Sequence, residues 1–349
     1  MSFSLRVDGQ QWRDHLARTI AQESSIVPVI KGNGYGFGNE QLAREASALP
    51  VSTIAVGTHS EVQRVREHFA REVLVLSPWH PTLSPAERNA SDATIRTVAH
   101  PEAVFALAKD QPGVPVVVEV LTSMRRHGVQ PTDLESLIRP LDELDVRGFA
   151  LHLPLDEQGA GTKVKDVISW ASRLTDAGLS PHTLWVSHLS AAELAQVRTT
   201  LSTTTVKPRV GTQLWHGNRQ HFAVNATVLD VHEVAKGDRV GYRQQSAPKD
   251  GHVLVVSGGT FHGVGLEAPS VSRGLTGRGK AVARTGLQAF GKAASPFWLA
   301  GQRLWFAEPP HMQVSMVWLP GDMAAPEIGA PLTCQVRMTT AHFDEVFGL

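Results

Sequence analysis

The chain has 349 residues, 42% of them hydrophobic, and equal totals of basic and acidic residues, 33 each. This composition excludes a disordered tail, a collagen and a coiled coil, and zero net charge provides no global field toward nucleic acid or an acidic membrane. Cys334 is the only cysteine, which rules out an internal disulfide and fits a reducing compartment. Residues 1–23 lack the apolar core of a signal peptide, and no apolar run is long enough to span a membrane. We therefore expect a cytoplasmic protein that binds neither nucleic acid nor membrane.

Strand-like runs alternate with helical patterns through the first two thirds of the chain. Thr58 and Glu61 form a capping-box pattern that predicts a helix start, with Val62, Val65 and Phe69 on one face of the helix. The predicted strands are Ile26–Ile30, Thr53–Val56, Val73–Leu76, Thr94–Val98, Pro115–Leu121, Val146–Leu153, Thr183–His188 and Thr204–Arg209. Eight such β-then-α units predict an α/β architecture, a (β/α)8 TIM barrel. A doubly wound open sheet is the alternative, and the lack of a G-x-G-x-x-G after an early strand disfavours it.

The pattern changes after Asn225. Runs such as ATVLDVHEV, HVLVVSGGTF, MQVSMVWLP and LTCQVRM are β-type and are separated by Gly, Pro, Asp and Lys, and one helix is possible near Gly286–Ala294. The sequence therefore predicts a TIM-barrel domain over residues 1–225 and an all-β domain over residues 226–349.

One segment of the second domain, Ser270–Ala307, has no acidic residue. Its basic residues are Arg273, Arg278, Lys280, Arg284, Lys292 and Arg303. It is either a solvated basic loop or a loop that faces an anion or a partner. Its string GRGK lacks the spacing and the preceding strand of a P-loop.

Chemistry in a TIM barrel is carried by residues at the carboxyl ends of the strands. In this chain Lys31, Arg126, His152, Ser190 and Arg209 follow or end predicted strands. A lysine, a histidine and two arginines on one face form a set suited to anions, and they could hold a phosphate and a carboxylate.

Each of these residues also has an ordinary structural interpretation. Lys31 and Arg126 could be solvated surface charges, and His152 could be a hydrogen-bonded core histidine. Ser190 begins the pattern S-A-A-E and could simply cap a helix, although a helix N-terminus also binds phosphate.

Four motifs in order along the chain carry a resemblance to a known family. VPVIKGNGYGFG, which contains Lys31, resembles the pyridoxal-phosphate lysine motif V-K-A-N-A-Y-G-H-G of the alanine racemase family. PRVGTQLWHG resembles its R-x-G-x-x-x-Y-G segment, GFALHLPLDEQG its G-x-x-x-H segment, and KGDRVGYRQ its β-domain motif G-x-x-V-S-Y-G. The only tyrosines of the chain, Tyr35 and Tyr242, both fall inside these motifs. The family combines a fold-type III barrel with a β domain, as predicted for this chain.

The resemblance implies pyridoxal 5'-phosphate as cofactor, held covalently by Lys31, and no metal. The residues implied to hold its phosphate are Tyr35, Ser190, Gly211 and Thr212, the last two through the backbone. Arg209 is implied to face the pyridine nitrogen, where a permanent cation opposes protonation of the ring. Related decarboxylases have a carboxylate at this position, so Arg209 favours racemisation over decarboxylation.

Racemisation requires two bases on opposite faces of the substrate Cα. The resemblance assigns these roles to Lys31 and Tyr242, with Tyr242 tuned by a hydrogen-bonded chain to His152 and Arg209. In the family the tyrosine comes from the partner subunit, which implies a homodimer with shared active sites. Arg126 and Met312 are implied to contact the carboxylate of a small amino-acid substrate.

Several positions depart from the family pattern. Glu119 stands where the family has a lysine that is often carbamylated, and as an anion it could orient Arg126 in the same way. Leu121 and Gln313 replace acidic residues, and the family's tyrosines in the stretch aligned with SGGTFHG and near the C-terminus are absent. The sequence therefore predicts an alanine racemase. The alternatives are a racemase of a larger amino acid, a non-catalytic homologue that binds the cofactor, and a barrel-type decarboxylase.

Overall fold

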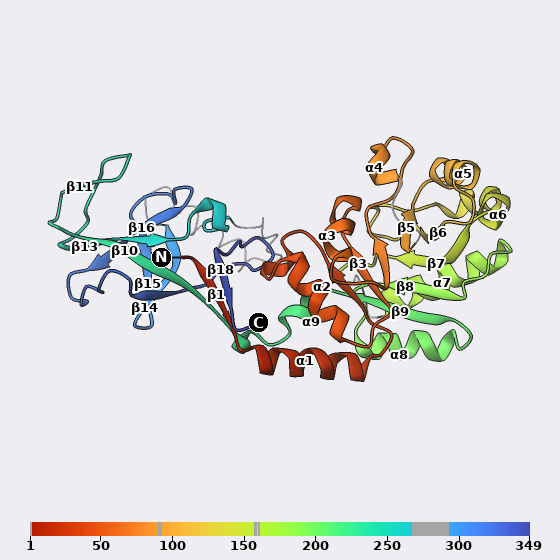
Figure 1. Ribbon diagram of the computed structural model, residues 1–349, viewed down its shortest axis with the longest axis horizontal. Helices are drawn as coiled ribbons and strands as arrows, with labels where there is room; N and C mark the ends of the chain where they lie inside the picture. Colours follow the sequence, from red (N-terminus) through yellow and green to blue (C-terminus); the bar gives the residue numbers. More distant parts are fainter. Residues whose placement is uncertain (1, 89–92, 157–158, 160, 267–292) are drawn as a thin grey trace. The chain divides into compact units, whose positions relative to one another are not determined.

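The computed structural model describes residues 2–88, 93–156, 159, 161–266 and 293–349, and the chain forms two compact units (Figure 1). The barrel unit consists of His15–Gly34 and Gly38–Gly217, and the β unit of Met1–Asp14, Tyr35–Phe37 and Asn218–Leu349. Helix α1 (Gly9–Gln22) runs from the β unit into the barrel unit.

The barrel unit contains a closed barrel of parallel strands in the order β2 to β9. The strands are β2 (Val27–Ile30), β3 (Thr53–Val56), β4 (Glu72–Val75), β5 (Thr94–Val98), β6 (Pro115–Glu119), β7 (Asp145–Leu151), β8 (Thr183–Val186) and β9 (Thr205–Val210). Pairing of Val27 in β2 with Arg209 in β9 closes the barrel. The predicted TIM barrel is thus confirmed, and the open doubly wound sheet is excluded.

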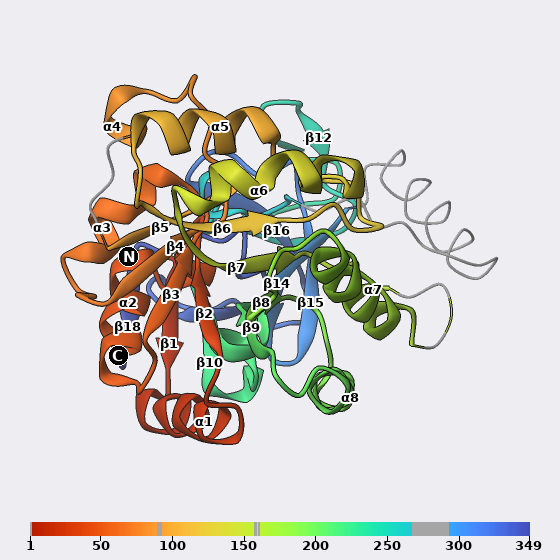
Figure 2. The ribbon, with the colours of Figure 1, turned by 90° about the vertical axis from the view of Figure 1, so that its right-hand side faces the viewer.

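Helices surround these strands, as Figure 2 shows for α5 to α8. They are α2 (Asn39–Ala48), α3 (Val62–Arg66), α4 (Pro85–Arg88), α5 (Pro101–Asp110), α6 (Leu134–Asp142), α7 (Thr162–Asp176), α8 (Ala191–Thr200) and α9 (Thr212–His216), with the 3-10 turns η1 (Gly34–Gly36), η2 (His59–Glu61) and η3 (Pro131–Asp133). The capping box predicted at Thr58 and Glu61 is present at the start of η2, which continues into α3.

The strands are apolar on both faces because one face fills the barrel interior and the other packs under the helices. Inward-facing side chains include Val29, Leu74, Val117 and Trp185, all buried. Burying a side chain of this size stabilises the fold by about 1.5–3 kcal/mol. The short apolar runs of the sequence are therefore sufficient to define the barrel and to direct the strand ends to a common rim.

The β unit is built on one sheet with the strand order β13-β16-β15-β14-β17-β10-β1-β18 and a further pairing of β13 with β10. Its strands are β1 (Ser4–Val7), β10 (Phe222–Val234), β13 (Gly251–Ser257), β14 (Ala294–Leu299), β15 (Gln302–Phe306), β16 (Val314–Pro320), β17 (Pro331–Cys334) and β18 (Glu345–Phe347). Turns η4 (Arg219–His221) and η5 (Thr260–His262) and the hairpin of β11 (Arg239–Val240) and β12 (Gln245–Ser246) complete it. The predicted all-β character is confirmed.

The units do not divide where the sequence suggested. The predicted boundary after residue 225 falls inside β10, and β1, assigned to the barrel, is paired with β10 and β18. In the basic segment, residues 294–306 form β14, β15 and their turn, so this part is not a loop. The rest of that segment up to residue 292, with nearly all of the possible helix at Gly286–Ala294, lies outside the described residues.

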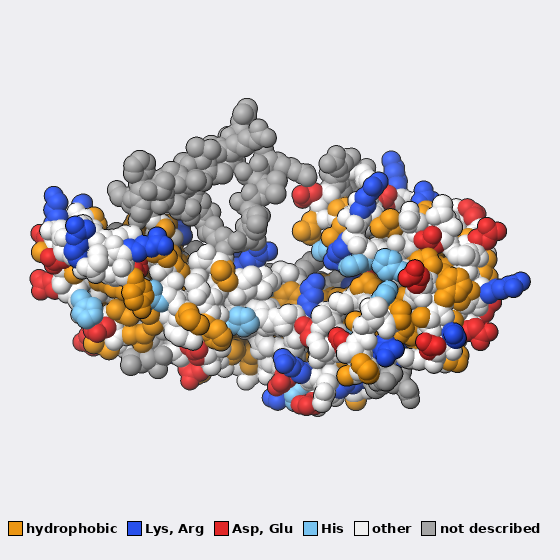
Figure 3. All heavy atoms as spheres, turned by 90° about the horizontal axis from the view of Figure 1, so that it is seen from above, with side chains coloured by type: hydrophobic (Ala, Val, Ile, Leu, Met, Phe, Trp, Pro, Cys, Tyr) orange, Lys and Arg blue, Asp and Glu red, His pale blue; other side chains and the backbone are white. Residues whose placement is uncertain are grey.

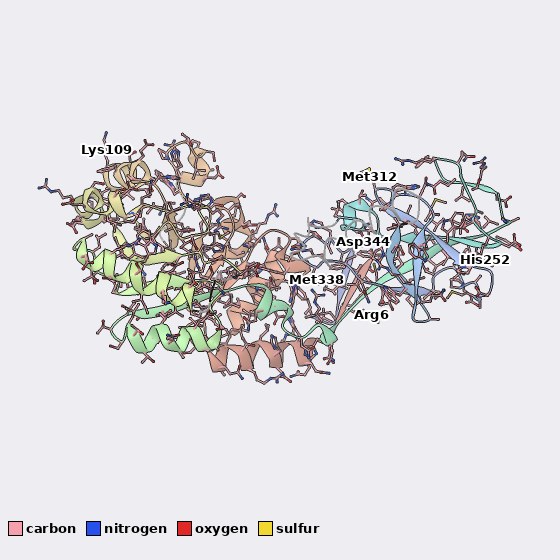
Figure 4. The ribbon with its side chains drawn as sticks, turned by 180° about the vertical axis from the view of Figure 1, so that it is seen from behind. Arg6, Lys109, His252, Met312, Met338 and Asp344 are labelled. Carbon is pink, nitrogen blue, oxygen red and sulfur yellow. The ribbon has the colours of Figure 1, made fainter. Side chains whose placement is uncertain are left out.

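His262 and Asp344 connect segments of the β unit that are far apart in the sequence. His262 Nδ1 accepts from the N–H of Gly259 at 3.1 Å, so its Nε2 carries the proton donated to Asp344 Oδ1, also at 3.1 Å. The other oxygen of Asp344, which is labelled in Figure 4, accepts from the N–H of Phe3 at 2.8 Å. Asp344 therefore holds the residue that precedes β1.

In the described part of the chain, we find no helix with the length and apolar character needed to cross a bilayer. Basic and acidic side chains are interspersed over the face in Figure 3, as expected for a chain of zero net charge.

Candidate functional site

Lys31 directly follows β2 at the carboxyl end of the barrel. Glu61 fixes the backbone around it, because its carboxylate accepts from the N–H of Gly32 at 2.7 Å and from those of Gly57 at 2.7 Å and Thr58 at 2.9 Å. A Cβ at Gly57 would lie 3.0 Å from the Cβ of Lys31. A side chain at this position would therefore crowd both Lys31 and the carboxylate of Glu61, whose Oε2 would lie 2.9 Å from the same Cβ.

The pKa of Lys31 lies below its ordinary value. Desolvation at the barrel mouth is the largest cause, and the charges of Arg126 and Arg209 lower the pKa further, against an opposing effect of Glu61. A lower pKa leaves more of the amine neutral near pH 7, and the neutral amine is the form that attacks an aldehyde.

Glu119 ends β6 with its carboxylate buried, and Arg126 lies in the loop that follows. Their side chains form an ion pair, Arg126 NH2 to Glu119 Oε1, at 3.8 Å. Gly128, with φ +136°, lets this loop fold back, since a Cβ there would lie 2.3 Å from the backbone of Leu121. The predicted orientation of Arg126 by Glu119 thus has a structural basis, although the functional role remains a prediction.

His152 follows β7, and its Nδ1 lies 3.0 Å from the hydroxyl of Ser187. Its ring packs edge-on against His188, with centroids 5.1 Å apart. Burial, then Arg126 and Arg209, lower the pKa of His152 to about 3. The imidazole is therefore neutral at physiological pH and can serve as a hydrogen-bond donor or acceptor.

Arg209 lies near the end of β9 and is buried. Its NH2 donates to the carbonyl oxygen of Leu151, the residue before His152, at 3.1 Å. Its buried Nε has no hydrogen-bond partner among the described residues. The guanidinium thus reaches the backbone beside His152 and keeps a donor that a ligand acceptor could use.

Lys31, Arg126, His152, His188 and Arg209 form what we call the rim cluster. Arg126 and Arg209 lower the pKa of Lys31, His152 and His188, which places these groups within electrostatic reach of one another. They come from the carboxyl ends of five strands, as predicted for four of them. Such a group of donors and cations, with the buried carboxyl group of Glu119 paired to Arg126, is suited to anionic ligands.

The residues expected to hold a phosphate from the barrel side lie at two helix starts. Ser190 is the N-cap of α8, with its Oγ accepting from Glu193 N at 3.3 Å. Gly211 precedes α9, and Thr212 begins it. The capping role of Ser190 is therefore real, and the Glu193 carboxylate, which accepts from Ser190 N at 2.6 Å, completes the capping box. The start of a helix is also the kind of place that binds an anion.

Tyr35 is buried, with a left-handed φ of 56°, and belongs to the β unit together with Gly36 and Phe37. Phe37 stacks on Trp12 with ring centroids 4.8 Å apart. Gly36 has φ +93°, and a Cβ there would lie 2.9 Å from Met338 Cε. Aromatic packing thus holds the Tyr35 segment against the β unit.

Tyr242 and Met312 are both presented outward by the β unit, with exposures of 86% and 71%. Tyr242 lies in the turn of the β11–β12 hairpin, and Met312, labelled in Figure 4, projects from the loop between β15 and β16. The ring of Tyr242 contacts His311, the residue before Met312, with centroids 4.8 Å apart. These two predicted residues therefore belong to neighbouring loops.

Sequence reasoning missed His188, Lys163, Glu308 and His311. His188 has a left-handed φ of 60°, and its carbonyl oxygen accepts from Lys163 Nζ at 2.9 Å. The position of His188 two residues after β8 is a signal that could have found it. No group of three metal-ligating side chains occurs within the described ranges.

Comparison with known proteins gives one consistent result. The family model of the alanine racemase N-terminal domain matches residues 10–217. An alanine racemase of Mycolicibacterium vanbaalenii is 27% identical over 269 residues, which cover 71% of this chain and 68% of the relative.

Two solved structures share the fold. The alanine racemase of Bacillus anthracis with bound L-Ala-P has a TM-score of 0.70 at 19% identity, covering 95% of this chain and 84% of the other. The alanine racemase of Bartonella henselae with covalently bound pyridoxal phosphate has a TM-score of 0.73 at 16% identity, covering 98% of each chain. The likeness therefore includes both the barrel and the β unit.

Proposed function

The chain belongs to the alanine racemase family, and from this premise we propose that it is a pyridoxal-phosphate-dependent amino-acid racemase with alanine as its default substrate. One observation carries the proposal: Lys31, Arg126, His152 and Arg209, from separate strand ends, are within electrostatic reach at one rim of the barrel. A racemase of this kind requires a nucleophilic lysine and fixed cations at one place.

The barrel residues fit pyridoxal phosphate. Arg209 has a buried Nε with no partner in the described chain, which suits the acceptor nitrogen of a pyridine ring. The lowered pKa of Lys31 suits covalent capture of an aldehyde, and the start of α8 suits a phosphate. The cofactor, when bound, supplies an electron sink for the substrate Cα.

The chain's own residues would then act as follows. Lys31 holds the cofactor and later exchanges a proton with the substrate Cα through Nζ on one face. Arg126 binds the substrate carboxylate, with Met312 beside it. Arg209 keeps a permanent cation at the pyridine nitrogen, which opposes protonation there and disfavours decarboxylation.

The second face requires a second acid–base group. We assign it to Tyr242 of the partner subunit in a homodimer, with the phenol Oη as the group that moves the proton. The outward presentation of Tyr242 supports this assignment. We assign Tyr35 to the phosphate, the barrel unit to cofactor binding, and the β unit to the partner's active site.

The site favours a racemase over the other candidates, but it leaves the amino acid open between alanine and a larger one. Gln313 replaces an acid beside Met312, and the family's two entrance tyrosines are absent, so the substrate side differs from the family pattern. We assign the enzyme to the cytoplasm, consistent with its single, buried cysteine, and expect its D-amino acid to serve the cell wall.

The direct test is α-proton exchange in heavy water. Purified protein with pyridoxal phosphate is mixed with L-amino acids one at a time and followed by proton NMR and chiral analysis. Exchange with formation of the D-isomer identifies the substrate. If the cofactor binds but exchange is absent across the panel, the racemase proposal is refuted for these substrates, and the non-catalytic homologue is favoured.

The cofactor assignment has its own test. Lys31→Ala is expected to abolish the visible absorption of covalently bound pyridoxal phosphate and its trapping by borohydride. Lys109→Ala, which changes an exposed lysine on α5 (Figure 4), is the matched control and should retain both. Trapping that persists in Lys31→Ala would show that another lysine holds the cofactor.

A further inference from the structure

Glu308, in the loop between β15 and β16, is a buried carboxylate at 4% exposure. One oxygen, Oε2, accepts from the backbone N–H of Tyr242 at 2.8 Å. The other, Oε1, lies 2.7 Å from Nε2 of His311. A single buried carboxylate thus connects the hairpin that carries Tyr242 to the loop that carries His311.

The hairpin is shaped to admit this carboxylate. Gly241 precedes Tyr242 with φ +73°, and a Cβ there would lie 2.3 Å from the carboxylate carbon of Glu308. Only glycine combines this backbone conformation with so close an approach. Gly241 is therefore required both by the backbone conformation of the turn and by the close approach of Glu308.

His311 is held at three points. Its N–H donates to Val314 O at 2.9 Å, and its carbonyl accepts from Thr260 N at 2.8 Å. Its Nε2 donates to Glu308, because a carboxylate oxygen only accepts. The imidazole ring is thereby fixed in orientation, and it packs on the ring of Tyr242 at 4.8 Å and 40°.

Tyr242 itself is 86% exposed. Glu308 fixes its backbone and His311 contacts its ring, so this pair restrains a side chain that solvent would otherwise leave free to change rotamer. Restraint of this kind matters for a group that must meet a reacting atom, since a misplacement of about 1 Å can reduce a rate about 100-fold.

We propose that Glu308 and His311 are positioning residues for Tyr242, which hold its phenol Oη in the orientation needed for proton transfer on the second face of the substrate. This rests on the proposed racemase function. The proton moves only between Oη and the substrate Cα, and neither Glu308 nor His311 exchanges it with substrate.

The test uses the holoenzyme and the two enantiomers of its substrate separately. In Glu308→Gln and His311→Ala, exchange of the α-proton into heavy water is expected to fall about 10- to 100-fold for the enantiomer served by Tyr242. Exchange from the other enantiomer, served by Lys31, should stay within about twofold, and the fall should appear in kcat rather than KM. Tyr242→Phe gives the full loss for comparison.

A matched control is available in the same unit. Asp230 lies 3.3 Å from His232 as an exposed carboxylate–histidine pair, so Asp230→Asn makes a comparable change away from Tyr242 and should leave both exchanges unchanged. His311→Ala tests the proposal even if Glu308→Gln does not fold, because it leaves the carboxylate bond to Tyr242 N in place.

A second readout does not depend on activity. Protein carrying 13Cζ-labelled tyrosine gives two NMR signals, since Tyr35 and Tyr242 are the only tyrosines. The signal that is lost in Tyr242→Phe belongs to Tyr242. We expect that signal to shift or broaden in Glu308→Gln and His311→Ala but not in Asp230→Asn. An unchanged Tyr242 signal, or equal falls for both enantiomers, would overturn the positioning role. If the wild type exchanges the α-proton of neither enantiomer, the racemase proposal fails. The NMR comparison then still shows whether Glu308 and His311 restrain the side chain of Tyr242.

Discussion

Arg126 NH2 lies 3.8 Å from Glu119 Oε1, with the guanidinium 41% exposed and the carboxylate only 2% exposed. Burial raises the pKa of Glu119, while the charges of Arg209 and Arg126 lower it. Burial is the larger effect, so the pKa of Glu119 lies above the ordinary value of a glutamate. The carboxylate, when ionised, pairs with Arg126. It gives Arg126 a fixed partner on one side and leaves its exposed side for a ligand.

Replacing this anion by an amide should weaken substrate binding more than cofactor binding. Glu119→Gln keeps the shape but removes the charge that orients Arg126, so we expect KM for the amino acid to rise about 3- to 10-fold, equivalent to about 1 kcal/mol. Steady-state kinetics measure this, with the exposed Glu135→Gln on α6 as control. An unchanged KM would mean that Glu119 does not orient Arg126.

Removing a positive charge near Lys31 should change the pH range in which the lysine reacts with pyridoxal phosphate. Arg126 lowers the pKa of Lys31, so Arg126→Met should raise that pKa and shift the rate of pyridoxal phosphate uptake by the apoprotein to higher pH. Stopped-flow absorbance over pH 6–10 measures the midpoint, and Arg139→Met on α6 is the control. A midpoint that stays or falls would contradict the electrostatic coupling.

Acid should destabilise the barrel unit through its histidines. The pKa of His152 is about 3 in the folded chain, and those of His59, His127 and His188 are also lowered, mainly by burial. Below about pH 6.5 the unfolded chain binds protons that the folded chain does not, so stability falls as pH falls through this range.

Thermal unfolding between pH 8 and 5 measures the effect. We expect Tm to decrease below pH 6.5, and to decrease less steeply in His152→Asn. Equal slopes in the two proteins would show that the pKa of His152 is not lowered in the folded state.

Loss of the Asp344 carboxylate should destabilise the β unit. Asp344→Ala removes the acceptor for Phe3 N and for His262 Nε2, each hydrogen bond contributing about 1 kcal/mol, so we expect Tm to fall by about 4–8 °C. Scanning calorimetry measures it, with the exposed Asp322→Ala as control. Because these bonds lower the pKa of Asp344, its contribution should disappear in wild type as pH falls through that lowered pKa.

The barrel was predictable because each strand is a short apolar run, and the eight predicted strands differ from the observed ones only near their ends. The rim residues followed from the same runs, since a parallel barrel sends every carboxyl end to one side. The same reasoning could have identified His188, which also follows a strand, but only Ser190 was selected there.

The limits of the β unit and the contacts of Glu308 could not be predicted, because they depend on segments that are distant in the sequence. Ser4–Val7 looks like an isolated four-residue run, and only its partners at residues 222–225 and 345–347 make it a strand of the β unit. Glu308 likewise has no periodic relation to Tyr242. Its importance comes from a tight approach to Gly241 that only the folded hairpin creates.

The position of β1 in the sequence also affects the order in which the two units can fold during synthesis. Its residues leave the exit tunnel before those of the barrel, and their sheet partners in β10 follow more than two hundred residues later. The barrel segments emerge in between and pair with near neighbours in sequence, so they can fold while synthesis continues. Strand β1 must wait unpaired through that interval, and its arginine, Arg6, provides the kind of charge that discourages association with other nascent chains.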